Sequence, residues 1–372
     1  MRVAILNTSY IRDGGSERVD DAFGQLFPEA DVFVLFAKEQ YIPPSLRGRR
    51  IFCSPLQHIP KIDKVYRLFF PFYPYATESL DLRGYNLVIS SDHGAMKGVL
   101  CDQESTHICY CHTPWRQMWD LYRTSLKIVP APLRPIYAMT AHYLREWDFL
   151  AAQRVDSFVA NSRYISNRIK KYYRRDSTVI YPPVETFRGY LSGDTGDYYL
   201  SVGRLSHAKR LDIVIEACKR MGRRLLICGE GREEKRLKAL AGPTIEFLGR
   251  VSDAELPTLY ANCRAFLFAA DEDFGIVSVE AQSFGRPVIA YGHGGSLETV
   301  LASDTQRHSD TGILFPEQTV ESMVDGIQRF ELIENRFDPK EIQKHARQFD
   351  RLVFQEQFSA FVDAALAGET AV

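Results

Sequence analysis

Short apolar runs alternate with glycine-containing polar loops and amphipathic stretches along most of this chain. In the first half, each run is about the length of one strand: Val3 to Leu6, Val32 to Phe36, Leu87 to Ser90 and His107 to Tyr110. Between the first two runs, a loop with Gly14-Gly15 precedes a stretch with Val19, Ala22, Phe23 and Leu26 at helical spacing. This strand–loop–helix–strand order predicts the opening of a Rossmann-type domain.

A second array of the same kind follows Tyr181-Pro182-Pro183-Val184, a stiff extended turn and the best candidate hinge. Its predicted strands are Tyr198 to Val202, Leu225 to Cys228, Ile245 to Leu248, Ala265 to Phe268 and Pro287 to Ala290. We therefore expect an α/β protein of two doubly wound Rossmann-like domains, residues 1–183 and 184–349. The final amphipathic segment, within residues 350–372, is expected to cross back to the first domain. A length of 372 residues suits two domains better than one.

The stretch from Asp271 to Gly285 carries the strongest chemical signal. The pattern places Glu272 in a strand-to-helix loop and Glu280 about one turn into the helix. Backbone N–H groups from Gly275 to Val277 would be free donors at the helix N-terminus. Carboxylates accept hydrogen bonds from sugar hydroxyls, and free amides donate to hydroxyls or phosphate. This arrangement favours a polyhydroxylated, anionic ligand over two solvated acids.

Arg204 and Lys209 are predicted to lie across a strand end and the first turn of the next helix. Arginine binds phosphate oxygens in a bidentate way and lysine adds a mobile charge, so the two would stabilise a leaving diphosphate. The alternative is a surface ion pair. No DxD-type metal motif precedes them, because Asp194 and Asp197 fall in a polar loop. We therefore expect chemistry that needs no metal.

Two features of the first half point to the same ligand. Gly14-Gly15 is not part of a GxGxxG fingerprint, yet it lets the backbone approach a phosphate, unless it is a plain tight turn. His112, within YCHTPWR, follows a predicted strand. It is expected to hydrogen-bond a sugar hydroxyl or to take a proton with a pKa near neutrality, the alternative being a structural histidine.

Composition and charge indicate the cellular compartment and the kind of surface that the protein contacts. Seven cysteines without a CxxC pair indicate a reducing cytosol, and we expect neither a signal peptide nor a membrane span. Residues 1–185 carry 24 Lys+Arg against 19 Asp+Glu, whereas the remainder carries 22 against 28. A basic first half suggests contact with an anionic surface. Two segments leave that question open: Lys61 to Leu80 is either core or a lipid-contacting patch, and the cationic helix from Arg163 is either a solvated face or a membrane face. The near-neutral chain has no nucleic-acid-binding motif.

Taken together, the motifs resemble the retaining glycosyltransferases of family 4, which have the GT-B fold of two facing Rossmann-like domains with a cleft between them. The motifs are Gly14-Gly15, YCHTPWR, VANSRYISNRIKKYY, VIYPPVE, SVGRLSHAKRLD, the GEG turn and EDFGIVSVE. The sequences YCHTPWRQMWD and IYPPV are most similar to the WbaZ-like mannosyltransferases of bacterial O-antigen (lipopolysaccharide), capsule and exopolysaccharide assembly.

The resemblance implies a role for each site residue. Arg204 and Lys209 would hold the donor diphosphate, while Glu280 would bind the ribose and Arg250-Val251 would lie by the base. Glu272 and the amides of Phe274, Gly275 and Ile276 would hold the transferred hexose. From the first domain, Gly14-Gly15 would approach the phosphate, Gly15 most closely, and His112 would contact the hexose. The leaving phosphate would take the acceptor proton, so no protein nucleophile, cofactor or metal is implied.

The same resemblance implies GDP-mannose as the donor and a lipid-linked or oligosaccharide acceptor. The enzyme would be cytoplasmic, with peripheral contact at the inner face of the membrane through its first domain. UDP-glucose, UDP-N-acetylglucosamine or an activated deoxysugar would use the same phosphate and ribose contacts. A non-catalytic binding protein, a nucleotide-sugar epimerase and a pyridoxal-dependent phosphorylase remain as alternatives.

Overall fold

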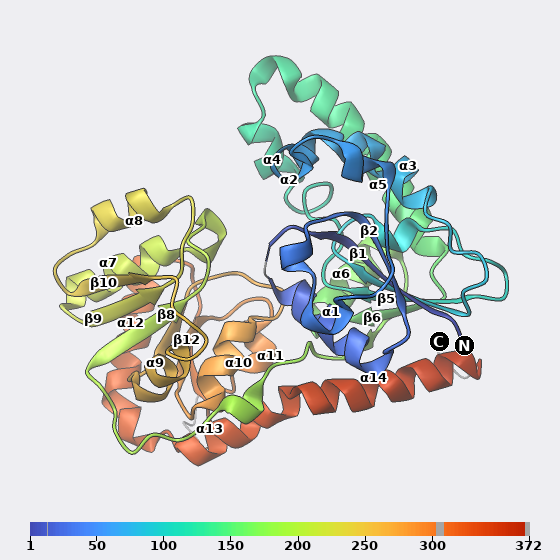
Figure 1. Cartoon of the computed structure of the whole chain (residues 1–372). Helices are drawn as coiled ribbons and strands as arrows, with labels where there is room; N and C mark the ends of the chain where they lie inside the picture. Colours follow the sequence, from blue (N-terminus) through green and yellow to red (C-terminus); the bar gives the residue numbers. More distant parts are fainter. Residues whose placement is uncertain (13, 303–308, 369–372) are drawn as a thin grey trace. The chain divides into compact units, whose positions relative to one another are not determined.

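The computed structural model describes residues 1–12, 14–302 and 309–368, and the chain divides into two compact units (Figure 1). The first unit comprises Met1–Pro183 with Phe354–Val372, and the second comprises Val184–Val353. The division therefore falls directly after Pro182-Pro183. The two units have the GT-B fold, in which each carries its own parallel sheet.

The first unit contains a seven-stranded parallel sheet in the order β3-β2-β1-β4-β5-β6-β7. Its strands are β1 (Val3–Tyr10), β2 (Asp31–Ala37), β3 (Ile51–Cys53), β4 (Leu87–Asp92), β5 (Thr106–Cys111), β6 (Ser157–Ala160) and β7 (Thr178–Val179). Its longer helices are α1 (Gly15–Leu26), α4 (Tyr122–Ile128), α5 (Arg134–Gln153), α6 (Arg163–Tyr173) and α14 (Arg351–Leu366). Ser162 is the N-cap of α6, since its hydroxyl accepts a hydrogen bond from the Ile165 amide at 3.2 Å.

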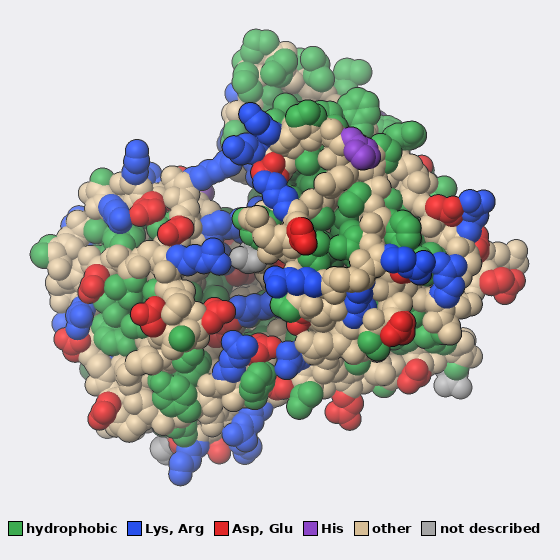
Figure 2. Space-filling view, in the orientation of Figure 1, with side chains coloured by type: hydrophobic (Ala, Val, Ile, Leu, Met, Phe, Trp, Pro, Cys, Tyr) green, Lys and Arg blue, Asp and Glu red, His purple; other side chains and the backbone are tan. Residues whose placement is uncertain are grey.

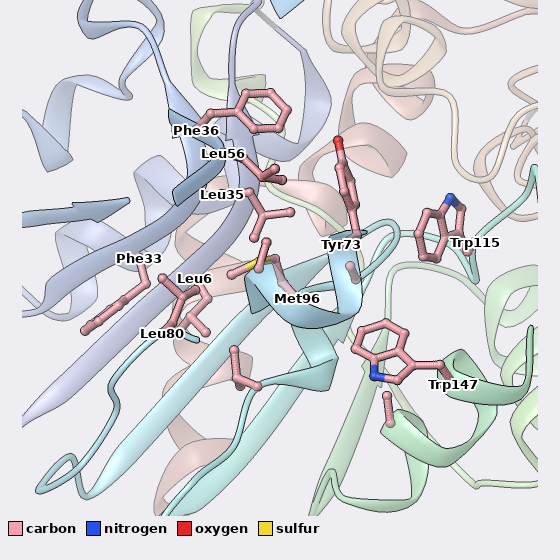
Figure 3. Close-up of a cluster of buried hydrophobic side chains, with 14 of the residues drawn as sticks. Leu6, Phe33, Leu35, Phe36, Leu56, Tyr73, Leu80, Met96, Trp115 and Trp147 are labelled. Atoms are coloured by element: carbon pink, nitrogen blue, oxygen red, sulfur yellow. The ribbon is translucent and has the colours of Figure 1, made fainter. Parts of the chain in front are cut away.

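Both faces of this sheet are covered, because alternate residues of β1 enter different cores. Ala4 and Leu6 belong to the cluster in Figure 3, together with Tyr73, Met96 and Trp147. Val3 and Ile5 belong to the cluster on the other face, which contains residues of α1 and α14. In that cluster, Phe354, Phe358 and Val362 of α14 are buried, and the Phe358 ring lies 4.5 Å from that of Phe23. The last helix thus completes the first unit.

The second unit contains a six-stranded parallel sheet in the order β10-β9-β8-β11-β12-β13. Its strands are β8 (Tyr198–Val202), β9 (Arg224–Cys228), β10 (Ile245–Gly249), β11 (Phe266–Phe268), β12 (Val288–Tyr291) and β13 (Gly312–Phe315). Its helices are α7 (Leu211–Met221), α8 (Glu234–Leu240), α9 (Leu256–Asn262), α10 (Ile276–Ser283), α11 (Ser296–Thr299), α12 (Val320–Ile333) and α13 (Pro339–Ala346).

The aromatic segment Lys61 to Leu80, predicted to be either core or a lipid-contacting patch, contains both buried and exposed side chains. It forms α2 (Ile62–Val65), the 3₁₀ helix η4 (Tyr66–Phe72) and α3 (Tyr73–Glu78). Tyr73 is buried, whereas Leu68, Phe72 and Tyr75 are exposed. Within the part of the chain described, none of the helices combines the length and the hydropathy that crossing a bilayer requires.

Candidate active site

In both sheets the strand order reverses once, and most of the predicted site residues follow the strands that border those points. Ligands of open α/β sheets bind at the carboxyl ends of the strands beside such a reversal. In the second unit the reversal lies between β8 and β11. Arg204 and Lys209 follow β8, and Glu272 follows β11, so residues of separate motifs meet at one edge of the sheet.

Lys209 and Glu272 are in direct contact. The Lys209 ammonium donates a hydrogen bond to Oε1 of Glu272 across 63 residues of sequence, and both side chains are partly exposed. Lys209 lies in a 3₁₀ turn, His207–Lys209, rather than in the first turn of a helix, so that detail of the prediction is wrong. The reason is local: Arg210 adopts a left-handed conformation (φ 48°), which separates this turn from α7. Arg204 is exposed on the same connection.

Two glycines of the GEG turn hold this connection in place by backbone contact. A Cβ atom on Gly229, whose φ is 132°, would lie 2.0 Å from the carbonyl oxygen of Gly203. A Cβ on Gly231 would lie 2.1 Å from the carbonyl oxygen of Leu205. The Leu205 amide also donates to the Glu230 carbonyl at 2.9 Å. Only glycine permits this approach, which fixes the loop that bears Arg204 and Lys209.

The loop after β12 supports the Glu272 loop in the same way. The Gly295 amide donates to the Glu272 carbonyl at 2.8 Å, and a Cβ on Gly295 would lie 2.3 Å from Cα of Phe274. Nδ1 of His293 lies 2.9 Å from Oδ1 of Asp271. No role was predicted for the glycines of this loop from the sequence. Their spacing, two glycines directly before a helix, was the available signal.

Helix α10 begins as predicted, at a glycine with an open N-terminus. Gly275 is the N-cap in the left-handed region (φ 89°), and no side chain caps the helix. The helix stops before Gly285, which adopts a left-handed conformation (φ 72°). Ser278 in the first turn was not predicted; its hydroxyl is buried and has no hydrogen-bond partner among the described residues. The N-terminus of α10 therefore presents donors beside Glu272.

The other site residues predicted for the second half of the chain also lie on this unit. Phe274 is buried, and Ile276 is the first residue of α10. Oε2 of Glu280 accepts a hydrogen bond from the Tyr260 hydroxyl at 2.9 Å, which orients the carboxylate. Arg250 and Val251 follow β10, at the end of the sheet farthest from β13.

In the first unit, Gly14 and Gly15 lie at the end of the β1–α1 connection. Gly14 is the N-cap of α1 in an extended conformation, and Gly15 is the first helical residue. Neither residue has a positive φ, so the backbone conformation does not require glycine at these positions. What glycine provides here is the absence of a side chain at the helix end. Both are exposed.

His112 follows β5, as predicted, but its protonation differs from the prediction. Nε2 of His112 lies 2.8 Å from the Ser91 hydroxyl. Burial of the ring, together with the nearby His93, lowers the pKa of His112 to about 3, although Asp92 opposes this. The expectation of a pKa near neutrality is therefore wrong. The imidazole is neutral at physiological pH and suits hydrogen bonding better than proton uptake.

The first unit also contains a buried ion network that was not predicted from the sequence. The Lys97 ammonium is fully buried and contacts carboxylates of Asp92, at 3.1 Å, and Asp148. Burial alone would lower the pKa of Lys97, but the charges of Asp148 and Asp92 raise it well above its ordinary value. Lys97 also donates to the Gly94 carbonyl at 2.6 Å, which ties down the loop after β4. Asp148 lies 51 residues from Lys97, so no spacing rule in the sequence joins the two.

Two glycosyltransferase family profiles match most of the chain. Residues 14–188 match the profile of Glycosyltransferase Family 4, and residues 185–349 match Glycosyl transferases group 1. The chain is 27% identical over 300 residues to the alpha-1,3/1,6-mannosyltransferase ALG2 of Saccharomyces cerevisiae, covering 62% of this chain and 58% of that protein. It is 28% identical over 146 residues to mannosylfructose-phosphate synthase of Agrobacterium fabrum, or 32% of each chain.

The fold has close structural counterparts at low identity. The structure of Anabaena Alr3699/HepE in complex with UDP superimposes with a TM-score of 0.70 and 18% identity, covering 98% of this chain and all of that one. The chain spans about half the length of the curated relatives it matches. With a Glycosyltransferase Family 4 unit followed by a group 1 unit, both on the GT-B fold, the chain belongs to the family 4 glycosyltransferases.

Proposed function

We propose that this protein transfers a hexose from a nucleotide sugar to a lipid-linked or oligosaccharide acceptor, with retention of configuration and without a metal. The observation that supports this most is the contact between Lys209 and Glu272 beside the open N-terminus of α10. A cation for phosphate, a carboxylate for hydroxyls and free amides lie within one loop cluster. A nucleotide sugar presents all three kinds of partner.

On this proposal each group has a defined task. Arg204 and Lys209 neutralise charge on the departing diphosphate, and Glu272 holds hexose hydroxyls with the amides of Phe274, Gly275 and Ile276. Glu280 binds the ribose, and Arg250-Val251 lie by the base.

From the first unit, Gly14-Gly15 approach the phosphate. Neutral His112 hydrogen-bonds the hexose without taking its proton, and the leaving phosphate accepts the acceptor proton instead.

For the donor we propose GDP-mannose. Support comes from the mannosyl names of the relatives ALG2 and mannosylfructose-phosphate synthase, together with the resemblance of YCHTPWRQMWD to bacterial surface-polysaccharide mannosyltransferases. A UDP-sugar is the alternative, because the diphosphate and ribose contacts would be the same for either nucleotide.

We further propose peripheral contact with an anionic membrane at its cytoplasmic face. Hydrophobic side chains gather over the α4–α5 projection of the first unit (Figure 2), where Ile128, Ile136 and Met139 are 80%, 62% and 74% exposed. The sequence between Asp120 and Glu146 holds four Lys or Arg and no acid. Apolar side chains among cations suit an anionic lipid surface. By contrast, Arg168 of the cationic helix α6 is buried against Asp120.

Liposome co-sedimentation tests the membrane proposal. Wild-type protein should sediment with vesicles containing anionic lipid and less with zwitterionic vesicles. Ile128→Ser combined with Met139→Ser should weaken binding, whereas Leu332→Ser, at an 81% exposed position of the second unit, should not. Absence of binding to both vesicle types would contradict membrane contact.

A panel of nucleotides and nucleotide sugars without added metal tests the donor proposal, since a ligand that binds the native state raises its melting temperature. Stabilisation by GDP and GDP-mannose, but not by UDP, supports the mannosyltransferase. Stabilisation by UDP-sugars alone would replace the donor and keep the mechanism. No stabilisation by any nucleotide would contradict the proposed function.

A further inference from the structure

A small cavity of about 80 Å³ lies at the strand reversal of the first sheet. The loops that follow β1 and β4 form one side of it, and η4 with the start of α3 forms another. Residues after β5, including Trp115, complete the lining. The cavity belongs entirely to the first unit, and none of the site residues predicted from the sequence lines it. Its size admits one end of a ligand.

Three of the lining residues hold a buried polar atom that lacks a partner among the described residues. They are the Thr8 hydroxyl, the Tyr73 hydroxyl and Nδ1 of His93. Thr8 is only 6% exposed and Tyr73 only 2%. Such groups are almost always hydrogen-bonded in folded proteins, so three around one cavity favour a polar ligand there. Sugar hydroxyls, which both donate and accept, would satisfy all three.

The cavity also has aromatic walls. The rings of Tyr73 and Trp115 are stacked, with centroids 5.9 Å apart and an angle of 28°, and Phe70 meets Trp115 edge-on at 5.4 Å. In Figure 3 the Tyr73 hydroxyl and the Trp115 indole nitrogen point to the same side. Rings with a polar tip offer an apolar face and a hydrogen-bonding group together, which matches a pyranose.

The charge around the cavity is positive. Arg12 and Arg67 line it and are exposed, and no described lining residue is acidic. Arg67 has a long hydrogen bond of 3.4 Å to the Tyr66 hydroxyl, which leaves most of its guanidinium donors available. Arginine is the side chain best suited to bind phosphate oxygens in a bidentate way. A neutral sugar alone would leave these two charges unused.

We propose that this cavity binds the phosphorylated-sugar end of the acceptor, with Arg12 and Arg67 on the phosphate and Thr8, Tyr73 and His93 on the sugar. This inference rests on the proposed transferase function. The phosphate comes either from a lipid-linked sugar or from a free sugar phosphate.

Calorimetric titration of the full chain tests the proposal with four probes: mannose 6-phosphate, mannose, inorganic phosphate and a water-soluble short-chain prenyl phosphate mannose. At least one phosphorylated sugar should bind at least tenfold more tightly than mannose or phosphate alone. Binding of the prenyl compound only identifies a lipid carrier, whereas binding of mannose 6-phosphate identifies a soluble acceptor.

Substitutions of the lining residues test whether the phosphorylated sugar binds in this cavity. Arg12→Ala and Arg67→Ala should each weaken it about tenfold, while Arg83→Ala, at an exposed arginine of the same unit, should not. Tyr73→Phe should also weaken binding but leave the melting temperature unchanged or raised, since the lost hydroxyl has no partner in the protein.

Three results would overturn the proposal: no binding of either phosphorylated sugar, equal binding of mannose or phosphate, or insensitivity to both arginine substitutions. Stabilisation by nucleotides is measured in the same samples. If nucleotides stabilise the protein while the phosphorylated sugars do not bind, the cavity assignment fails and the transferase function stands.

Discussion

The strand reversals of the two sheets are built on the same topology but differ in chemistry. In the second unit, the reversal is surrounded by charged side chains that already have partners, such as Lys209 with Glu272 and Tyr260 with Glu280. In the first unit, the cavity at the reversal is lined by aromatic rings, by the exposed Arg12 and Arg67, and by uncharged polar atoms, such as the Tyr73 hydroxyl, that lack a partner among the described residues. Identical topology therefore positions a ligand without selecting it, and the side chains after each strand decide its chemistry.

The two regions also hold their loops in different ways. Around the second reversal, glycines let backbone segments touch, as at Gly229 and Gly295. Around the first, a buried lysine between two carboxylates holds the loop after β4. Backbone contact fails if any side chain is added, whereas an ion network fails if one charge is removed.

The largest effect is expected from Lys97→Met. It leaves Asp92 and Asp148 buried without their counter-charge, so the free energy of unfolding should fall by about 3–5 kcal/mol. Chemical denaturation followed by circular dichroism measures it. The matched change at an exposed pair, Arg83→Met beside Asp81, should barely move the transition. Similar effects of both substitutions would contradict the role of the network.

The next largest effect is expected on turnover, from removing the charge of Glu272 or of Lys209 in the second unit. Glu272→Gln and Lys209→Ala should each lower turnover at least about 100-fold, or about 2.7 kcal/mol, because a transition-state electrostatic contact is lost. Turnover is measured as the release of nucleoside diphosphate from the nucleotide sugar that stabilises the protein in the panel described above. Lys235→Ala, at an exposed lysine of α8, is the control. Near-normal turnover in both variants would show that the site lies elsewhere.

A glycine pair tests the backbone contact. Gly229→Ala should weaken nucleotide affinity about tenfold or more, because its Cβ would lie 2.0 Å from the Gly203 carbonyl oxygen. Gly222 also has a positive φ, of 64°, but a Cβ there would meet nothing within 4 Å, so Gly222→Ala should cost only about 1 kcal/mol of stability and leave affinity intact. Equal affinities for the two variants would refute the proposed support of the Arg204–Lys209 loop.

A separate prediction concerns pH. Burial raises the pKa of Asp20 from 3.8 to about 7, although hydrogen bonds from Ser91, Asn7 and Tyr10 oppose this. The folded state therefore retains a proton that the unfolded state releases, and this contribution to stability is present below pH 4 and lost as pH rises through 7. Asp20→Asn should remove of the order of 4 kcal/mol of that pH dependence, because one pKa unit corresponds to about 1.4 kcal/mol. Parallel pH–stability curves for the two proteins would contradict it.

Much of the local structure could be predicted because it depends on neighbours in sequence. The apolar runs define the strands, Ser162 caps α6, and Gly275 and Gly285 bound α10, since each depends only on backbone groups a few residues away. The motifs at Glu272 and Arg204 were found because both follow apolar strands. The 3₁₀ turn at Lys209 was missed, because nothing in its local pattern announces the left-handed Arg210.

By itself, then, the sequence determined the α/β class, the strands and the motifs that carry charge, because hydrophobic periodicity and capping are local properties. Only the tertiary structure decided which motifs meet. Strand order brings Lys209 to Glu272, burial makes His112 neutral, and packing encloses Lys97 between Asp92 and Asp148. It also gathers Thr8, Tyr73 and His93 around one cavity. Contacts, burial and pKa all depend on neighbours that are distant in sequence and close in space.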